Sequence, residues 1–289
     1  MEQELTESYV KELLTTGDST EGQLLVPRKI YDILIDEVDK ALIPRTEAAF
    51  YIGPAGIPGS SVDIDLVTPN KMSVRIVAEG SEIYLDQEEY STTNVKPVKY
   101  GVAIKITKEL MEDSKWDMLA HNVKRAGKLF AENETNLILT ALDGAANTVS
   151  GGTAVTIANI TRATQYLDDA DYNATTLLVG NEVINDCRNI DTFVEAQKFG
   201  SNEMLRNGMV GTLYGLNVIK FSTNAAPSTT YAKYAYVYDK MEAFCIAEKR
   251  PITVENFTIP LMDMQGAAIT QRIKVTLLRS SAVAKITSS

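Results

Sequence analysis

The sequence has 289 residues, with 28 Lys and Arg against 38 Asp and Glu, so its formal net charge at pH 7 is −10. Hydrophobic residues make up 45% and charged residues 23% of the chain, which is typical of a globular protein and excludes global disorder. The acidic balance argues against a protein whose main task is to grip nucleic acid through many phosphate contacts.

The chain begins with an acidic arm. Residues 1–24 contain six acidic residues and one basic residue. Pro27 to Ile43 repeats apolar residues at helical spacing, which predicts a helix that Pro44 ends. The Gly- and Pro-rich run from Gly53 to Gly59 predicts a loop.

An extended, acidic segment follows. Val62 to Leu66 alternates apolar residues with aspartate, and Val74 to Ala78 is a second short apolar run, so both predict strands. An acidic loop continues through Tyr90, and a third alternating run covers 98–106. We expect a long hairpin with an acidic middle, because residues 61–95 hold seven acidic residues and two basic residues. It has too few apolar residues to cover itself, so it must lie on another surface.

Residues 114–142 have the pattern of one long helix. Ser114 is a suitable N-cap, and Gly144 ends the run. At 1.5 Å per residue such a helix is about 40 Å long. Its apolar stripe repeats every seven residues, at Trp116, Val123, Phe130 and Leu137.

Beyond Gly151-Gly152 the pattern changes to short alternating helices and strands, typical of an α/β unit. The expected elements are a helix at 160–170, a strand at 176–179, a helix at 181–188, and strands at 216–222 and 231–238. The chain then turns to strands again, at 252–259 and 269–277, which we expect to pair with the hairpin base or lie beside the long helix. Residues 249–289 are basic, with six basic residues against two acidic ones.

The sequence offers no convincing catalytic site. It contains no nucleotide-binding glycine motif, no GxSxG and no HExxH. Asp63 and Asp65 would project from one face of a strand, which leaves a carboxylate-dependent hydrolase as one hypothesis. Cys187 and Cys245 are too few for a disulfide framework and lie in apolar surroundings, so we expect two buried thiols in a reducing compartment.

Metal sites are equally poorly supported. His121 is the only histidine and falls off the apolar stripe of the long helix, so no multi-histidine site can form. The run 169–173 matches the opening of a calcium loop, but Ala174 and Gly180 replace its required glycine and glutamate. We therefore expect no cofactor and no metal. No apolar run reaches the length of about 18 residues that a membrane helix needs, so we expect no membrane contact.

Several motifs occur in an order known from one family. Val77-Ala78-Glu79-Gly80 is followed by the run 90–114, whose end, Ile106 to Ser114 (ITKELMEDS), leads into the long helix. Gly211 to Val218 reads GTLYGLNV, with Asn217 where the family has proline. In these motifs and their order, from about Pro27 to Ile286, the sequence resembles the major capsid proteins of tailed bacteriophages and related archaeal viruses.

The resemblance implies the Hong Kong ninety-seven-type capsid fold, of α+β class. This fold has an N-arm, an extended β-hairpin called the E-loop, a P-domain with a long spine helix, and an α/β A-domain. The implied boundaries are an N-arm at 1–24, an E-loop at 60–95, a P-domain at 25–59, 96–149 and 249–289 with its spine helix at 114–142, and an A-domain at 150–248.

The resemblance also implies the function. A major capsid protein is no enzyme; it assembles with itself, as hexamers and pentamers, into an icosahedral shell that encloses double-stranded DNA by weak, non-specific contact. Scaffolding, portal and cement proteins are further partners that the family admits. The expected location is the virion, with assembly in the host cytoplasm.

Opposite charges suggest where neighbouring subunits meet, because complementary charges set the register of an interface. We expect an acidic E-loop to lie on basic P-domain strands of the next subunit. The predicted contacts are Glu79, Glu82, Glu88 and Glu89 on one side and Arg250, Arg272, Lys274 and Arg279 on the other. Some relatives join subunits through a lysine near the loop tip, but 78–90 contains no lysine, so no such cross-link is expected. The roughly 24 residues before Leu25 are too few for a built-in scaffolding segment.

Two alternatives remain open at this point. An encapsulin-type compartment uses the same fold to enclose an enzyme, and the particle's contents would separate it from a virus shell. The hydrolase based on Asp63 and Asp65 would instead be a monomer with an acidic cleft.

Overall fold

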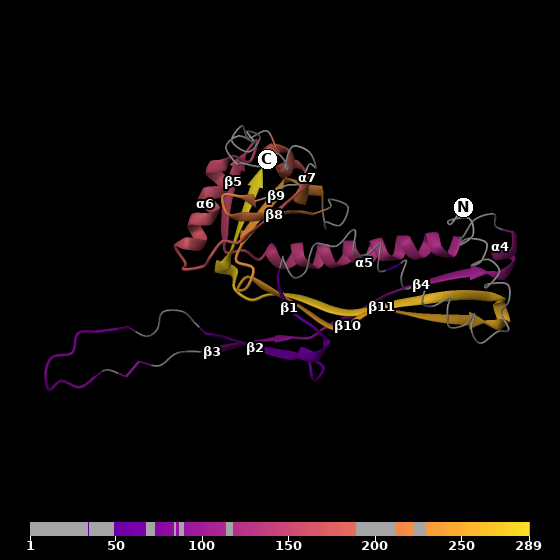
Figure 1. Cartoon of the computed structure of the whole chain (residues 1–289), viewed down its shortest axis with the longest axis horizontal. Helices are drawn as coiled ribbons and strands as arrows, with labels where there is room; N and C mark the ends of the chain where they lie inside the picture. The colour runs from indigo at the N-terminus through magenta and orange to yellow at the C-terminus, as the bar shows by residue number, and fades with distance from the viewer. Residues whose placement is uncertain are drawn as a thin grey trace.

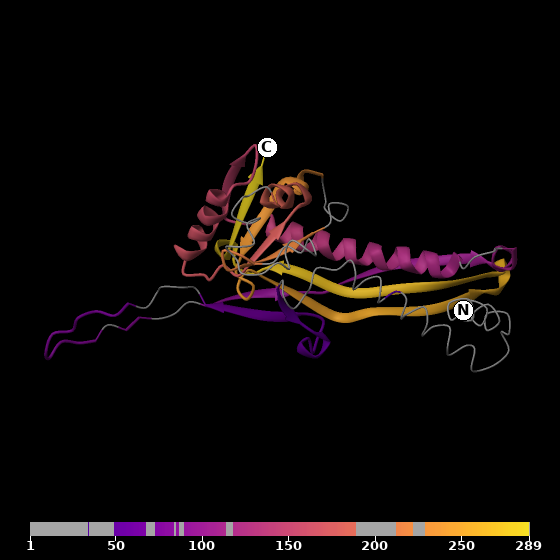
Figure 2. The ribbon, with the colours of Figure 1, turned by 45° about the horizontal axis from the view of Figure 1, so that its top comes forward.

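The computed structural model describes residues 34, 49–67, 73–83, 85–86, 90–113, 118–188, 212–221 and 229–288. A long sheet with one helix along it carries a mixed α/β lobe at one end, and a thin limb projects beyond that end (Figures 1 and 2). The expected helix at 27–43 lies outside the described residues except for Leu34, which is helical and fully buried.

The long sheet has four strands in the order β1-β10-β11-β4. Strands β10 and β11 form an antiparallel hairpin, β4 pairs antiparallel with β11, and β1 pairs parallel with β10. A short helix, α4 (Lys108–Asp113), follows β4. The strand bounds are β1 Phe50–Ile52, β4 Val98–Thr107, β10 Phe244–Ile259 and β11 Met264–Leu277.

The predicted long helix is observed as α5 (Met118–Leu142), and residues 114–117 lie outside the description. It runs along one face of the long sheet, as Figure 1 shows. Val123 and Phe130 from the predicted stripe are buried there against Ile252 and Ile269. Alternate residues of β4 and β11 therefore point toward α5, and the residues between them lie on the opposite face, which we call the open face. Near the lobe this face is covered within the same chain, because Ile57 and Val95 pack on Cys245 and Ala247 of β10.

The α/β lobe contains a six-stranded sheet in the order β5-β12-β9-β6-β8-β7. The predicted strand at 176–179 and helix at 181–188 are confirmed by β6 and α7. The bounds are β5 Asn147–Gly152, β6 Thr176–Val179, β7 Thr212–Leu213, β8 Leu216–Lys220, β9 Tyr234–Tyr238, β12 Val283–Ser288, α6 Ile157–Asp168 and α7 Asn181–Arg188.

Strand β12 lies outside the long sheet. The strands expected at 252–259 and 269–277 lie in β10 and β11 beside α5. The implied P-domain range 249–289 also includes β12, but β12 pairs parallel with β5 and antiparallel with β9 inside the lobe. Its side chains explain the position, because Ala284 and Ile286 are fully buried in the lobe core beside Val237. The chain therefore crosses from the long sheet to the lobe once more after β11.

The limb consists of β2 (Val62–Val67), β3 (Tyr90–Val95) and the described residues between them. Two expectations for this region are wrong. Residues 73–78 form no strand, and β2 pairs with β3, whereas the alternating run at 98–106 belongs to β4 in the long sheet. A short apolar run needs a neighbouring strand for its backbone hydrogen bonds, and 73–78 has no such neighbour among the described residues.

Short 3-10 turns connect several of these elements. They are η1 Pro54–Gly56, η3 Thr229–Lys233, η4 Pro260–Met262 and η5 Ser280–Ala282. None of the described helices combines the length and the apolar character that crossing a lipid bilayer requires.

Candidate functional site

The limb exposes apolar side chains that a soluble single chain would normally bury. Val74 and Ile76 on one arm are fully exposed, and on the other arm Leu85 is 98% and Ile83 is 72% exposed. Burying a side chain of this size contributes on the order of 1.5–3 kcal/mol. Four of them together offer a favourable surface for a partner, because exposed apolar clusters mark interaction sites.

The limb is ordered by its own polar contacts. The carboxylate of Asp86 accepts hydrogen bonds from the Ser73 backbone N–H (3.1 Å) and from the Arg75 guanidinium (3.3 Å). At the tip, the Ser81 N–H donates to the Ala78 carbonyl at 3.0 Å, and Gly80 adopts φ +81. A glycine at this φ allows the tight turn without strain, so the two arms are held side by side.

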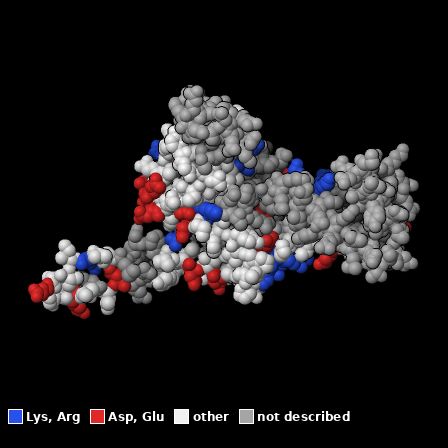
Figure 3. Space-filling model, viewed as in Figure 1, with Lys and Arg blue, Asp and Glu red and all other residues white. Residues whose placement is uncertain are grey.

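The acidic residues predicted for the interface are only partly described. Glu79 and Glu82 are exposed near the turn, and acidic atoms mark the far end of the limb in Figure 3. Glu88 and Glu89 lie outside the described residues. The described part of the limb thus presents apolar and acidic side chains together.

The predicted basic residues converge on the open face of the long sheet. The strand register places Arg272 of β11 directly opposite Arg250 of β10 on one side and Lys99 of β4 on the other. We call these three residues the basic row. Lys274 lies two residues further along the same face of β11, and Figure 3 shows Lys and Arg atoms along the margin of β10 and β11 away from α5.

The basic row has few compensating contacts. Arg250 donates to the Thr270 hydroxyl at 2.8 Å, and Arg272 reaches the Pro97 carbonyl at 3.5 Å. No ion pair joins the row to an acidic residue in the part of the chain that is described. Like charges directly opposite one another in a sheet are destabilising, so the row favours an anionic partner.

Sequence reasoning missed Lys99. Its signal was present, since Lys99 and Lys105 alternate with apolar residues along β4 and must share one face. What the sequence lacked was the pairing of β4 with β11, which brings Lys99 beside Arg272.

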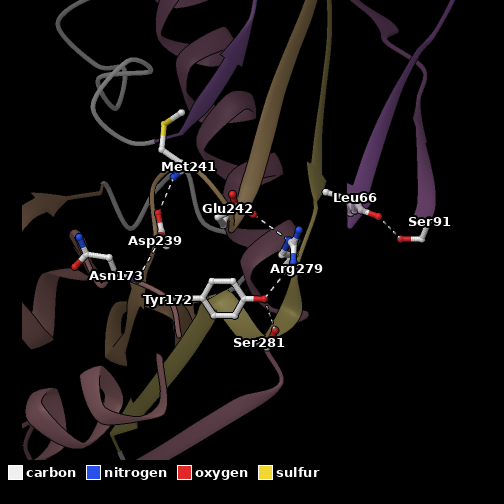
Figure 4. Close-up of polar contacts among 9 residues, drawn as sticks. All are labelled: Leu66, Ser91, Tyr172, Asn173, Asp239, Met241, Glu242, Arg279 and Ser281. Carbon is white, nitrogen blue, oxygen red and sulfur yellow. Dashed lines mark hydrogen bonds and ion pairs between the residues drawn. The ribbon is translucent and has the colours of Figure 1, made fainter. Parts of the chain in front are cut away.

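Arg279 lies apart from the basic row, at the junction between the long sheet and the lobe. Its guanidinium forms an ion pair with Glu242 at 3.0 Å and donates to the Tyr172 hydroxyl at 3.4 Å (Figure 4). The Arg279 side chain is only 18% exposed. It is therefore engaged within its own subunit.

The residues proposed for hydrolysis form no enclosed site. Asp63 and Asp65 occupy the exposed face of β2, where they accept hydrogen bonds from the Asn94 amide and the Thr92 hydroxyl of β3. A catalytic carboxyl group works in an enclosed site within reach of a bound substrate, and these two side chains are exposed on the strand surface. They serve as cross-strand pairs that stabilise the base of the limb.

The remaining candidates are structural. Cys187 and Cys245 are free and fully buried, and burial raises the pKa of each thiol to about 11. His121 is exposed on α5. Within the described ranges, no group of three or more His, Cys, Asp or Glu side chains could hold a metal ion.

Comparison with known proteins points in one direction. A family model described as phage capsid protein matches residues 88–285, which is more than half of the chain. A comparison with curated proteins gave no match.

Solved structures share the fold across most of the chain. The mature capsid of bacteriophage PhiM1 matches with a TM-score of 0.65 at 10% identity, covering 84% of this chain and 86% of its own. A structure of Mycobacterium phage Che8 matches with a TM-score of 0.64 at 16% identity, covering 79% of this chain and 84% of its own. A virus-like particle from Pyrococcus furiosus matches with a TM-score of 0.59 at 12% identity, covering 90% of this chain and 98% of its own. The expected capsid fold is thereby confirmed, and neither the compartment nor the hydrolase is favoured.

Proposed function

Because the chain belongs to the phage capsid protein family, we propose that its copies assemble into a closed icosahedral shell, built of hexamers and pentamers, around double-stranded DNA. Its role as a major capsid protein is structural. The observation that carries the proposal is the limb, which leaves Val74, Ile76 and Leu85 almost entirely exposed in the single subunit. Such a surface becomes stable when a neighbouring copy covers it.

We assign the parts of the subunit accordingly. In this proposal the limb is the E-loop, α5 is the spine helix of the P-domain, and residues 1–24 are the N-arm. The lobe is the A-domain, with β5 and β12 added to it because both strands belong to its sheet. The site of action is the virion, with assembly in the host cytoplasm and with scaffolding, portal or cement proteins as further partners.

The limb of one copy would lie on the open face of the next. Its acidic side chains would then face the basic row, which relieves the repulsion within the row and fixes the register of the contact. Arg279 is left out of this proposal because Glu242 already pairs with it. The proposed partners are Glu79, Glu82, Glu88 and Glu89 on the limb and Arg250, Arg272 and Lys274 on the open face, with Lys99 added.

Electron microscopy of the purified protein tests the shell directly. We expect closed particles that protect double-stranded DNA from nuclease when they are isolated from their natural source. A particle that holds a folded protein in place of nucleic acid would point to a compartment, and a monomer at all concentrations would contradict the proposal. Boiling in SDS should release single chains, since 78–90 offers no lysine for a cross-link.

Two variants test the contact itself. Replacing Ile76 and Leu85 by serine should abolish or slow assembly without changing the unfolding temperature, because both side chains are exposed in the subunit. Leu129→Ser, on the exposed side of α5, is the matched control. Reversing Arg272 and Lys274 to glutamate should impair assembly more at low salt than at high salt. Unchanged assembly of both variants would rule out the limb contact.

A further inference from the structure

Within the described residues, the chain crosses between the long sheet and the lobe three times, and these three crossings lie against one another. They are residues 143–146 after α5, residues 239–243 between β9 and β10, and residues 278–282 between β11 and β12. Figure 1 shows all three at the end of the long sheet beneath the lobe.

Backbone hydrogen bonds join every crossing to another. The Ala146 N–H donates to the Ser280 carbonyl at 3.0 Å, which links the first crossing to the third. The Leu278 N–H donates to the Ala243 carbonyl at 2.8 Å and the Asp239 N–H to the Ala282 carbonyl at 3.1 Å, which links the second to the third. A rotation of the lobe against the long sheet would have to break these bonds.

A side-chain cluster fastens the crossings to the loop after α6 (Figure 4). Arg279 of the third crossing pairs with Glu242 of the second, and both Arg279 and Ser281 donate to the Tyr172 hydroxyl at 3.4 Å. Asp239 accepts from the Asn173 backbone N–H at 3.2 Å and from the backbone N–H of Met241 at 2.9 Å.

Packing leaves little freedom at this point. The ring of Tyr172 packs against both the lobe core and the core beneath it. That second core is continuous from Leu139 at the end of α5 to Tyr238 in the lobe and Ile273 in the long sheet. A Cβ atom at Gly144 in the first crossing would lie 3.0 Å from Leu277 Cδ2, so the crossing and the sheet are already in close contact.

We infer that the three crossings form a locked joint, in which Arg279 and Tyr172 are positioning residues that fix the angle between the lobe and the long sheet. Large apolar contacts between two parts of a chain suppress their relative motion. The subunit body is then one rigid unit, and the angle at the joint sets the curvature that neighbouring subunits can adopt. The second half of this inference rests on the proposed function, and the first half does not.

Amide hydrogen exchange on the full-length protein tests the lock. Arg279→Gln, Glu242→Gln and Tyr172→Phe each remove part of the cluster and keep a side chain of similar size. We expect exchange at the Ala146, Asp239 and Leu278 amides to become about three- to tenfold faster, with amides in the middle of β10 and β11 unchanged. Exchange in the double variant at 242 and 279 should be little faster than in either single variant, because the two residues form one ion pair.

Arg162→Gln is the matched control, since it removes the same charge from an exposed site on α6 in the lobe. It should leave all three amides unchanged. Unchanged exchange in the Arg279, Glu242 and Tyr172 variants would overturn the joint. Faster exchange spread evenly over both sheets would also overturn it, because the cluster would then serve stability in general.

The diameter of assembled particles tests the link to curvature. Arg279→Gln and Tyr172→Phe should broaden or shift the distribution of diameters measured by electron microscopy. Arg279→Lys keeps the charge, so its distribution should lie closer to that of the unaltered protein. Faster exchange with an unchanged diameter would overturn the link to curvature. Absence of particles from the unaltered protein would contradict the proposed function, and the exchange measurement would still decide the joint.

Discussion

Replacing Arg272 by glutamine should separate the stability of the subunit from its capacity to assemble. Arg272 lies between Arg250 and Lys99, one on each neighbouring strand, so its charge takes part in two like-charge contacts. Each such contact costs about 0.2–1 kcal/mol in an exposed sheet. The substitution removes this repulsion, but it also removes one long hydrogen bond, from Arg272 to the Pro97 carbonyl at 3.5 Å, and some packing by the side-chain stem.

In the free energy of unfolding, these contributions nearly cancel or leave the variant slightly more stable. We expect the free energy of unfolding of Arg272→Gln to be unchanged or up to about 1 kcal/mol higher. If the proposed contact forms, assembly should weaken at the same time, because a carboxylate of the neighbouring limb would lose its partner. Urea unfolding of the unassembled subunit measures the first effect, and light scattering during assembly measures the second.

Salt dependence makes the test sharper. The Debye length falls from about 10 Å at 0.1 M salt to about 3 Å at 1 M, so the difference in assembly between variant and parent should shrink over this range. Lys105→Gln is the control, because Lys105 lies on the same face of β4 but opposite Gly266, with no like charge across the strand. A loss of more than about 1 kcal/mol of stability in Arg272→Gln, or equal assembly at low salt, would refute the reasoning.

Three further results follow from buried or constrained groups. Burial raises the pKa of Tyr238, whose hydroxyl has no hydrogen-bond partner among the described residues. As the pH rises, Tyr238 therefore ionises in the unfolded chain before it ionises in the folded one, and the free energy of unfolding should fall above about pH 10. Tyr238→Phe should lose less stability in that range and should be as stable as the parent, or about 1 kcal/mol more stable, at neutral pH. Unfolding curves recorded at neutral and alkaline pH measure both effects. Cys187 and Cys245, with pKa values raised to about 11 by burial, should resist a thiol reagent at pH 8 until the protein unfolds; labelling of the native protein would contradict their burial. Gly80→Ala places a Cβ in open space but at φ +81, so the substitution should cost about 1 kcal/mol of backbone strain, confined to the turn of the limb. Calorimetry should show an unchanged unfolding temperature and scattering a slower assembly, whereas a lower unfolding temperature would mean that the limb turn supports the core.

Elements with a strong local signal could be predicted from the sequence. Helix α7 and strand β6 were expected at the residues where they occur, because Gly180 separates a short apolar run from an amphipathic one. Helix α5 was expected from its seven-residue repeat, and Val123 and Phe130 of that repeat are buried. The alternation of apolar and polar residues along β11 by itself places the candidate basic residues Arg272 and Lys274 on one face.

Pairing between distant segments could not be predicted in the same way. The apolar run 74–78 has the composition of a strand, but a strand also needs a partner, and its side chains face solvent in the single subunit. Strand β3 was missed because its residues Ser91 to Asn94 are polar, so they give no alternation of apolar and polar residues. The place of β12 and the basic row depend on which strands are neighbours, which no local pattern specifies.

The position of β12 has a consequence for biosynthesis. Among the described residues, β5 pairs with β12 alone in the six-stranded sheet, and β12 lies far downstream of it in the chain. The lobe therefore stays unfinished while more than a hundred intervening residues are translated, and closure of its sheet waits for a contact that is distant in sequence. A nascent chain therefore holds β5 without its pairing strand until residues 283–288 have emerged from the ribosome.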